Sequence, residues 1–259
     1  DNVAIGFEAL KTEDAHGQNV AIGYQALKIQ DAGANGINTA VGYAAGAAVT
    51  TGVRNTIIGG LAGDALTTSA DNVAVGAQAL SSETTGLYSV AVGQGALASQ
   101  NNTGDAQIHN VAVGYQAGVG ITTGIQNTLV GSKAGDALTV GGYNVAIGSF
   151  ALTTDTAGSK SIAVGHGALN AQNLTSATDI YNVAIGHQAG VALTTGGTNV
   201  IVGGLAGTAL TTASNTVAIG FQAGTAITTG SNNIAIGRIA GDSITTSPSN
   251  TIIGSSAGI

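Results

Sequence analysis

The sequence predicts an all-β fold, a parallel β-solenoid or β-roll of about fifteen turns, and two observations predict it. The pentad Asn-Val-Ala-Ile-Gly and its close variants occur fifteen times, with glycines from Gly6 to Gly254. A constant 17-residue step separates most successive glycines, and the three longer steps run from Gly23 to Gly42, from Gly93 to Gly114 and from Gly165 to Gly186. Self-similarity at a fixed short period is typical of solenoids, in which each repeat contacts only its neighbours.

Each pentad has the pattern of one short strand that ends at its glycine. Counted from that glycine, position minus three is Val, Ile or Thr, minus two is Ala or a larger aliphatic residue, and minus one is Ile or Val. A β-branched run this short between Asn and Gly is typical of a strand. We interpret the glycine as a strand end that needs a positive φ or a close backbone approach. Ala stands at plus three in every copy, which indicates a tight corner.

The second half of the repeat has two forms. One reads Gly-x-x-Ala-Leu, and the other reads Gly-x-x-Ala-Gly with an aliphatic residue three positions later. The forms alternate in pairs through most of the chain, which creates a 72-residue super-repeat from Gly42 to Gly114 and on to Gly186. We expect the turns to stack as parallel strands about 4.8 Å apart, in a rod roughly 70 Å long. The Asn residues at minus four should then form a hydrogen-bonded ladder.

Both faces of the predicted strand are apolar, although side chains alternate between the faces. We place minus three and minus one inside the coil, so that minus two faces outward with no polar member. Because a solvent-facing strand should carry polar residues, we predict that this face is buried in a parallel homotrimer; the alternative is a monomer with an apolar stripe. The bulky residues of this candidate inter-chain face are Ile57, Leu129, Ile201 and Ile252.

Composition limits the partners. Charged residues are 7% of the chain, the net charge is -7, and the six Lys and Arg residues are scattered, which disfavours nucleic acid and anionic membrane surfaces. No apolar run approaches the ~20 residues of a membrane helix, and without cysteine there is no thiolate metal site. We find no carboxylate or cysteine set at ligand spacing and predict no cofactor and no metal. None of the four histidines has such a set nearby; they are His16, His109, His166 and His187.

The chain carries no convincing catalytic motif. Residues 254–258 match the nucleophile pattern Gly-x-Ser-x-Gly, yet the position of Ser256 varies freely between repeats, as Glu8, Lys133 and Ile239 show. A polysaccharide depolymerase would need paired carboxylates, which no turn supplies. Recurring Thr pairs such as residues 67–68 raise an ice-binding alternative, but adjacent Thr residues on an extended chain point to opposite faces. We therefore predict a protein that is not an enzyme.

Two features are candidates for recognition. The residue after the motif glycine is often aromatic or planar, and rings from adjacent turns should stack into a surface column able to pack on sugar rings; the alternative is stacking that only protects the strand edge. The candidate recognition residues are Phe7, Tyr24, Tyr43, Tyr115, His166 and His187. The long turns, residues 28–37, 98–109 and 170–181, should project as polar loops, and loops on a rigid scaffold commonly carry function.

The motif Asn-Val-Ala-Ile-Gly-x-x-Ala resembles the head repeat of trimeric autotransporter adhesins of the YadA type, and residues 19–27 are even more similar to repeats of bacteriophage tail-fibre proteins. The resemblance implies a trimeric left-handed parallel β-roll. It also implies an extracellular location, on a virion tail fibre or a bacterial cell surface, and a glycan or protein receptor. The 17-residue turn is longer than the usual adhesin turn, which favours the phage-type fibre. We expect residues 1–259 to be a single continuous solenoid segment and an excerpt of a longer fibre chain.

Overall fold

The structure is a computed structural model that describes residues 1–13, 16–104 and 106–258. The chain forms a parallel β-solenoid of about fifteen turns, as predicted, and no helix occurs among the described residues. In particular, the described part contains no helix long and apolar enough to cross a membrane. The chain divides into two compact units, Asp1–Asn127 and Thr128–Ile259.

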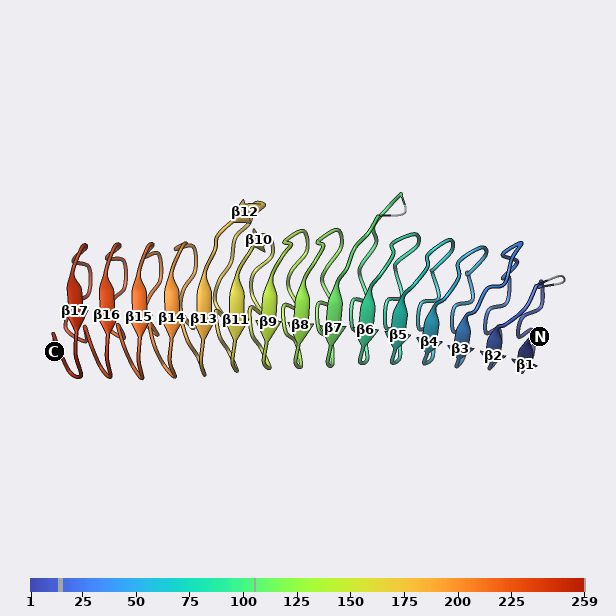
Figure 1. Ribbon diagram of the computed structural model, residues 1–259, viewed down its shortest axis with the longest axis horizontal. Coiled ribbons are helices and arrows are strands. Elements are labelled where there is room, and N and C mark those ends of the chain that lie inside the picture. Colours follow the sequence, from blue (N-terminus) through green and yellow to red (C-terminus); the bar gives the residue numbers. More distant parts are fainter. Residues whose placement is uncertain (14–15, 105, 259) are drawn as a thin grey trace. The chain divides into compact units, whose positions relative to one another are not determined.

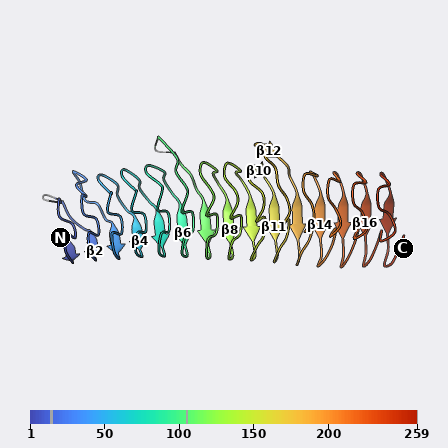
Figure 2. The ribbon, with the colours of Figure 1, turned by 180° about the vertical axis from the view of Figure 1, so that it is seen from behind.

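Each motif pentad forms one three-residue strand, and the strands of each unit run in the same direction (Figures 1 and 2). The first unit contains β1 (Val3–Ile5), β2 (Val20–Ile22), β3 (Thr39–Val41), β4 (Thr56–Ile58), β5 (Val73–Val75), β6 (Val90–Val92) and β7 (Val111–Val113). The second unit contains β8 (Thr128–Val130), β9 (Val145–Ile147), β10 (Gly158–Ser159), β11 (Ile162–Val164), β12 (Thr178–Asp179), β13 (Val183–Ile185), β14 (Val200–Val202), β15 (Val217–Ile219), β16 (Ile234–Ile236) and β17 (Thr251–Ile253).

Within each unit every motif strand pairs in parallel with the motif strand of the next turn, and equivalent positions lie opposite each other. In β2 and β3, for example, Ala21 lies opposite Ala40. The insertions of the long turns are absorbed outside the ladder, because β11 and β13 remain in register although the step from Gly165 to Gly186 is longer than usual. The short strands β10 and β12 form a separate parallel pair, in which β12 belongs to the long turn between Gly165 and Gly186 and β10 to the turn before it.

The coil closes on the opposite face of the strand from the one we predicted. Ile57, Leu129 and Ile201 at minus two are each 0% exposed, and Ile252, in the last strand, is half-buried. The predicted inter-chain face is therefore wrong, because these residues fill the interior of their own coil. Their neighbours there are aliphatic groups: a Cβ placed on Gly46 would lie 2.8 Å from Ile57 Cδ1.

The motif glycine and the alanine at plus three make the corner that the sequence indicates. Gly59 has a φ of +135°, and a Cβ added to it would lie 2.5 Å from the carbonyl oxygen of Gly76 in the next turn. Both reasons offered for glycine, positive φ and close backbone approach, therefore hold. Ala62 at plus three is 0% exposed and donates its N–H to the Gly59 carbonyl, so that only a small side chain fits inside this turn.

The two forms of the turn are two ways of filling the same interior. At plus four the backbone is left-handed in both forms, with φ of 48° at Leu27 and 59° at Gly46. For Leu this conformation costs about 1–2 kcal/mol, which burial of about 1.5–3 kcal/mol offsets; Leu27 is 0% exposed. Where Gly stands at plus four, the aliphatic residue at plus seven, such as Val49, is buried instead.

The predicted Asn ladder is present and is buried in the single chain. Asn72 donates its backbone N–H to Oδ1 of Asn55 over 3.0 Å, and Nδ2 of Asn55 donates to the carbonyl of Ser69 over 2.8 Å. The Asn55 side chain therefore binds two places in the following turn, the ladder residue Asn72 and the loop residue Ser69 just before it. The ladder uses backbone N–H groups as well as the amide–amide bonds expected from the sequence.

Candidate functional site

No pocket is found among the described residues, and the features of interest are surface columns and buried polar pairs. The first surface is the outward strand face, which we define as the residues at minus three and minus one of the motif strands. Its members include Ile58, Ile147 and Ile185, which are 39%, 39% and 41% exposed. Because equivalent residues of adjacent strands lie opposite each other, this face is a continuous array of Val, Ile and Thr within each unit.

The predicted aromatic column exists at the first turns. The rings of Phe7 and Tyr24 stack with centroids 5.5 Å apart, and those of Tyr24 and Tyr43 with centroids 5.3 Å apart. All three rings are exposed. The column stands at plus one, directly beyond the ends of β1, β2 and β3, so that it borders the outward strand face.

The other candidate recognition residues are distributed along the chain. His166 and His187 stack with centroids 5.4 Å apart, and Phe150 meets His166 edge-on. Tyr115 is exposed after β7 and has no ring contact among the described residues. The structure therefore brings the candidate recognition residues together only in two short groups.

A second surface column was missed from the sequence. It stands at minus five, where Tyr88 stacks on His109 at 5.1 Å and Arg54 makes a bidentate ion pair with Asp71. The Arg54 guanidinium lowers the pKa of Asp71, and the hydrogen bond to Asp71 raises the pKa of Arg54. Residues at this position have positive φ, which turns successive side chains to the same side. The signal was available in the sequence, because the residue five positions before the motif glycine is polar or aromatic in most repeats.

The long turns lie outside the regular coil, as Figure 1 shows for the loops between β6 and β7 and around β12. Two of them are anchored by a buried isoleucine near their ends, Ile108 and Ile180. Ile108 donates its N–H to the Leu87 carbonyl and Ile180 to the Ser159 carbonyl. Residue 105, within the predicted loop 98–109, lies outside the described residues. Whether these loops bind a ligand stays a prediction.

Buried polar pairs accompany the turns that carry Leu at plus four. In these turns plus seven is an acid in the first turn of each pair and Gln in the second. Glu83 is 0% exposed, and its carboxylate accepts bonds from the N–H groups of Thr84, Gly86 and Asn102 and from Nε2 of Gln100.

The equivalent Asp155 is satisfied in the same way. It accepts from the N–H groups of Gly158 and Leu174 and from Nε2 of Gln172. Because all of these donors come from the protein itself, we interpret Glu83 and Asp155 as structural acids that pin the loop to the coil.

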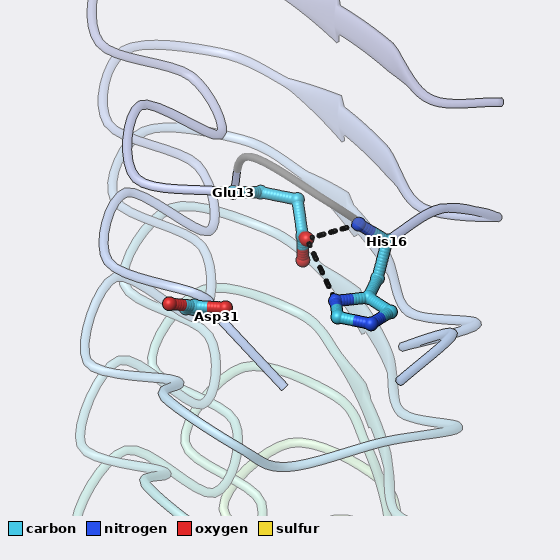
Figure 3. Close-up of side chains that lie close together, drawn as sticks. All are labelled: Glu13, His16 and Asp31. Atoms are coloured by element: carbon cyan, nitrogen blue, oxygen red, sulfur yellow. Dashed lines mark hydrogen bonds and ion pairs between the residues drawn. The ribbon is translucent and has the colours of Figure 1, made fainter. Parts of the chain in front are cut away.

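The third acid of this series, Glu13, lies in a different environment (Figure 3). Its carboxylate accepts a bond from the backbone N–H of His16 over 2.9 Å, and its Oε1 lies 3.9 Å from His16 Nδ1. With Asp31 of the next turn, these residues place one ligand atom each within 4.8 Å of one another. The prediction that His16 has no carboxylates at ligand spacing is wrong, because Glu13 and Asp31 both lie close enough to share an ion with it. Comparing the residues at equivalent positions of the three acid-bearing turns would have pointed to this cluster.

No family model, curated protein or solved structure matches this chain. The likeness of the pentads to adhesin-head and tail-fibre repeats therefore rests on the residues of the motif themselves. The surfaces that the coil presents are the remaining guide to its function.

Proposed function

We propose that this chain is a structural segment of a surface-attachment protein without enzymatic activity. The observation that carries the proposal is the outward strand face. Parallel strands in register place β-branched side chains on it turn after turn, and exposed apolar arrays of this kind mark interaction sites. An assembly of several copies covers this face and leaves the polar loops in water.

A parallel homotrimer is the assembly we propose. The resemblance of the pentads to trimeric adhesin heads and tail fibres implies three chains, and the outward strand face now takes the place of the minus-two residues as the inter-chain contact. The attachment protein is then a bacteriophage tail fibre, with the head of a bacterial adhesin as the alternative. In either case the location is extracellular and the segment displays a binding tip.

The exposed ring column supports a contribution to recognition. The rings of Phe7, Tyr24 and Tyr43 are stacked on one another and exposed, so the column offers ring edges and tyrosine hydroxyl groups to a ligand, a combination of apolar surface and hydrogen-bonding groups that suits a sugar. Repetition along an assembly would add many weak contacts, which raises overall avidity. A cell-surface glycan or protein is the class of receptor that we propose.

The oligomeric state tests the assembly. A chain of 24.8 kDa is expected to show three times that mass by light scattering. The combined substitutions Ile147→Glu, Ile185→Glu and Ile219→Glu place charges on the outward strand face and should reduce the particle to one chain. Circular dichroism should show that the coil remains folded, because these side chains are exposed on one chain.

A matched control puts the same charge in the same three turns but at minus five. The substitutions Tyr143→Glu, Tyr181→Glu and Asn215→Glu change exposed side chains away from the outward strand face and should leave the mass at three chains. A wild-type chain that is monomeric at micromolar concentration contradicts the proposal, as does a control variant that dissociates equally.

A further inference from the structure

Three turns of the chain carry an acid at plus seven, and one of them is built differently. In two turns the carboxylates of Glu83 and Asp155 are satisfied by backbone N–H groups and a Gln side chain. In the first turn Gln30 stands where Gln100 and Gln172 stand, but its Nε2 donates to Asn19 Oδ1 instead. Glu13 Oε2 is buried and has no hydrogen-bond partner among the described residues.

Two residue differences accompany the unsatisfied carboxylate. At plus ten the other two turns have Gly86 and Gly158, and a Cβ added to Gly86 would lie 2.7 Å from Glu83 Cδ. The first turn has His16 there, so that an imidazole occupies the space beside the carboxylate. At plus eight of the following turn the other pairs have Asn101 and Asn173, whereas this pair has Asp31. Both differences replace a neutral residue with a side chain that ligates metal ions.

The side chains converge on one place, although residues 14 and 15 between Glu13 and His16 lie outside the described part. The Glu13 side chain is 0% exposed and the His16 side chain 33% exposed. His16 Nδ1 is itself buried and, among the described residues, has no hydrogen-bond partner. Figure 3 shows the imidazole and the Glu13 carboxylate facing each other, with Asp31 coming from the next turn. Glu13 Oε2 is therefore a buried acceptor without a donor among the described residues, and His16 Nδ1 offers a lone pair to a metal ion when the neutral imidazole carries its proton on Nε2.

We propose that Glu13, His16 and Asp31 form a binding site for a divalent transition-metal cation, with Zn²⁺ as the expected ion. A cation would satisfy Glu13 Oε2 and His16 Nδ1 together and would compensate the buried carboxylate charge. The exposed Asp31 would be the ligand on the solvent side. The three side chains would leave the fourth coordination position of the ion for a water molecule. This site goes beyond the proposed attachment function and does not depend on it.

The mixture of donors selects the ion. One imidazole nitrogen and two carboxylates are ligands typical of zinc, at about 2.0–2.2 Å from the metal, whereas Mg²⁺ and Ca²⁺ take oxygen ligands. Two donors on one such ion lie at most about 4.4 Å apart. The ligand atoms lie within 4.8 Å of one another, so that small side-chain rotations bring them onto a common ion. A network of exposed carboxylates alone would have favoured calcium.

Calorimetric titration of the full chain, first treated with EDTA and dialysed, tests the site. Zn²⁺ should bind with one ion per chain, and Ca²⁺ and Mg²⁺ should bind at least about tenfold more weakly, since imidazole suits zinc and carboxylate oxygens suit the harder cations. In NMR spectra the His16 imidazole signals should shift with Zn²⁺. The double variant His16→Gly and Asp31→Asn introduces the residues of the other two turns, so it should fold and lose zinc affinity by more than about tenfold.

Two further variants distinguish this site from zinc bound by the exposed histidines. His187→Gln removes one of the stacked, exposed histidines and should leave the zinc affinity unchanged. Glu13→Gln should lower the affinity as strongly as the double variant. The proposal is overturned if the metal-free chain takes up no zinc, if zinc follows His187 rather than His16, or if calcium binds as tightly as zinc. An ion pair between protonated His16 and Glu13 alone would give the first of these outcomes.

Discussion

Asn55 donates its backbone N–H to Oδ1 of Asn38 in the preceding turn over 2.8 Å, and its Nδ2 to the same oxygen over 3.1 Å. The backbone bond repeats where two motif asparagines succeed each other, as between Asn55 and Asn72, and both bonds are present between Asn182 and Asn199. Since the asparagines are buried, the ladder replaces water as the partner of their polar groups. The stacking of turns is therefore specified by hydrogen bonds as well as by apolar burial.

Substitution Asn55→Ala should destabilise the coil by about 2–5 kcal/mol, because it removes the acceptor of the Asn72 N–H and a donor to the Ser69 carbonyl in a buried place. Urea denaturation measures the loss in free energy of unfolding. Asn55→Ser is the matched control and should cost less, because its hydroxyl keeps a hydrogen-bonding group where Ala has none; Ser89 occupies this ladder position in another turn, and its Oγ accepts a bond from Nε2 of Gln100. Equal stability of Asn55→Ala and wild type would contradict the ladder's role.

The inside and outside of a strand are distinguished by two adjacent residues of β14. Ile201→Ala removes a fully buried side chain and should cost about 2–5 kcal/mol. Val200→Thr changes an exposed residue to one found at the same position in β3 and β4, and should change the stability of a single chain by about 0.5 kcal/mol or less. The comparison is made by thermal unfolding under conditions where both variants are monomeric. A larger loss for Val200→Thr would reverse the assigned faces.

Two consecutive glycines give a backbone test. A Cβ on Gly59 would meet the backbone of Gly76 at 2.5 Å, and its φ is +135°, whereas a Cβ on Gly60 would meet nothing within 4 Å. Gly59→Ala should therefore prevent the two turns from stacking and cost more than about 1 kcal/mol. Gly60→Ala should be neutral or stabilising by up to about 1 kcal/mol. Melting temperatures of the two variants check this, and similar values would show that the corner tolerates a side chain.

Asp64 should make stability depend on pH. Burial raises its pKa above the ordinary 3.8, and its Oδ1 has no partner among the described residues. A raised folded-state pKa means that the folded chain favours the protonated acid. The stability linked to this group is thus full below pH 3.8 and is lost as the pH rises through the folded-state pKa.

Asp64→Asn should therefore raise the melting temperature at pH 7, with a gain that disappears as the pH approaches the ordinary pKa of 3.8. Asp136 occupies the same position but accepts a hydrogen bond from Thr153, so Asp136→Asn should give no such gain. A lower melting temperature for Asp64→Asn at pH 7 would show that the ionised carboxylate has a partner that stabilises it.

Much of the coil could be predicted because its repeats are nearly identical. Fifteen pentads at a nearly constant step specify parallel strands in register. The recurring motif glycine indicates a positive φ or a close backbone contact at the end of each strand. The stacked rings of Phe7, Tyr24 and Tyr43 follow from the same register. The residues at minus two could not be assigned in this way. Because side chains alternate along a strand, the residues at minus two lie on the face opposite minus three and minus one. Both faces are apolar, so the sequence does not show which of them the coil encloses.

The candidate metal site shows the other limit of a repeat pattern. Glu13 and His16 are close in sequence, but Asp31 comes from the next turn and is brought beside them only by stacking. These residues stand out only when this turn is compared with the turns of Glu83 and Asp155. A consensus of the repeats does not show residues that occur in one turn alone. Positions that depart from a repeat therefore carry information that the repeat itself does not.

The sequence by itself determined the strand, the corner and the order of stacking, since each depends on local backbone preference and on the match between neighbouring copies. The tertiary structure decided which apolar face the coil encloses, because that depends on the volume left when Ala62 and Leu27, or Val49 in the other form of turn, pack inside. It also decided that Glu13 Oε2 and His16 Nδ1 are buried without a hydrogen-bond partner in the described part of the chain. Both outcomes depend on how successive turns pack against one another. They are therefore set by distances between residues of different turns, which the sequence of one repeat does not specify.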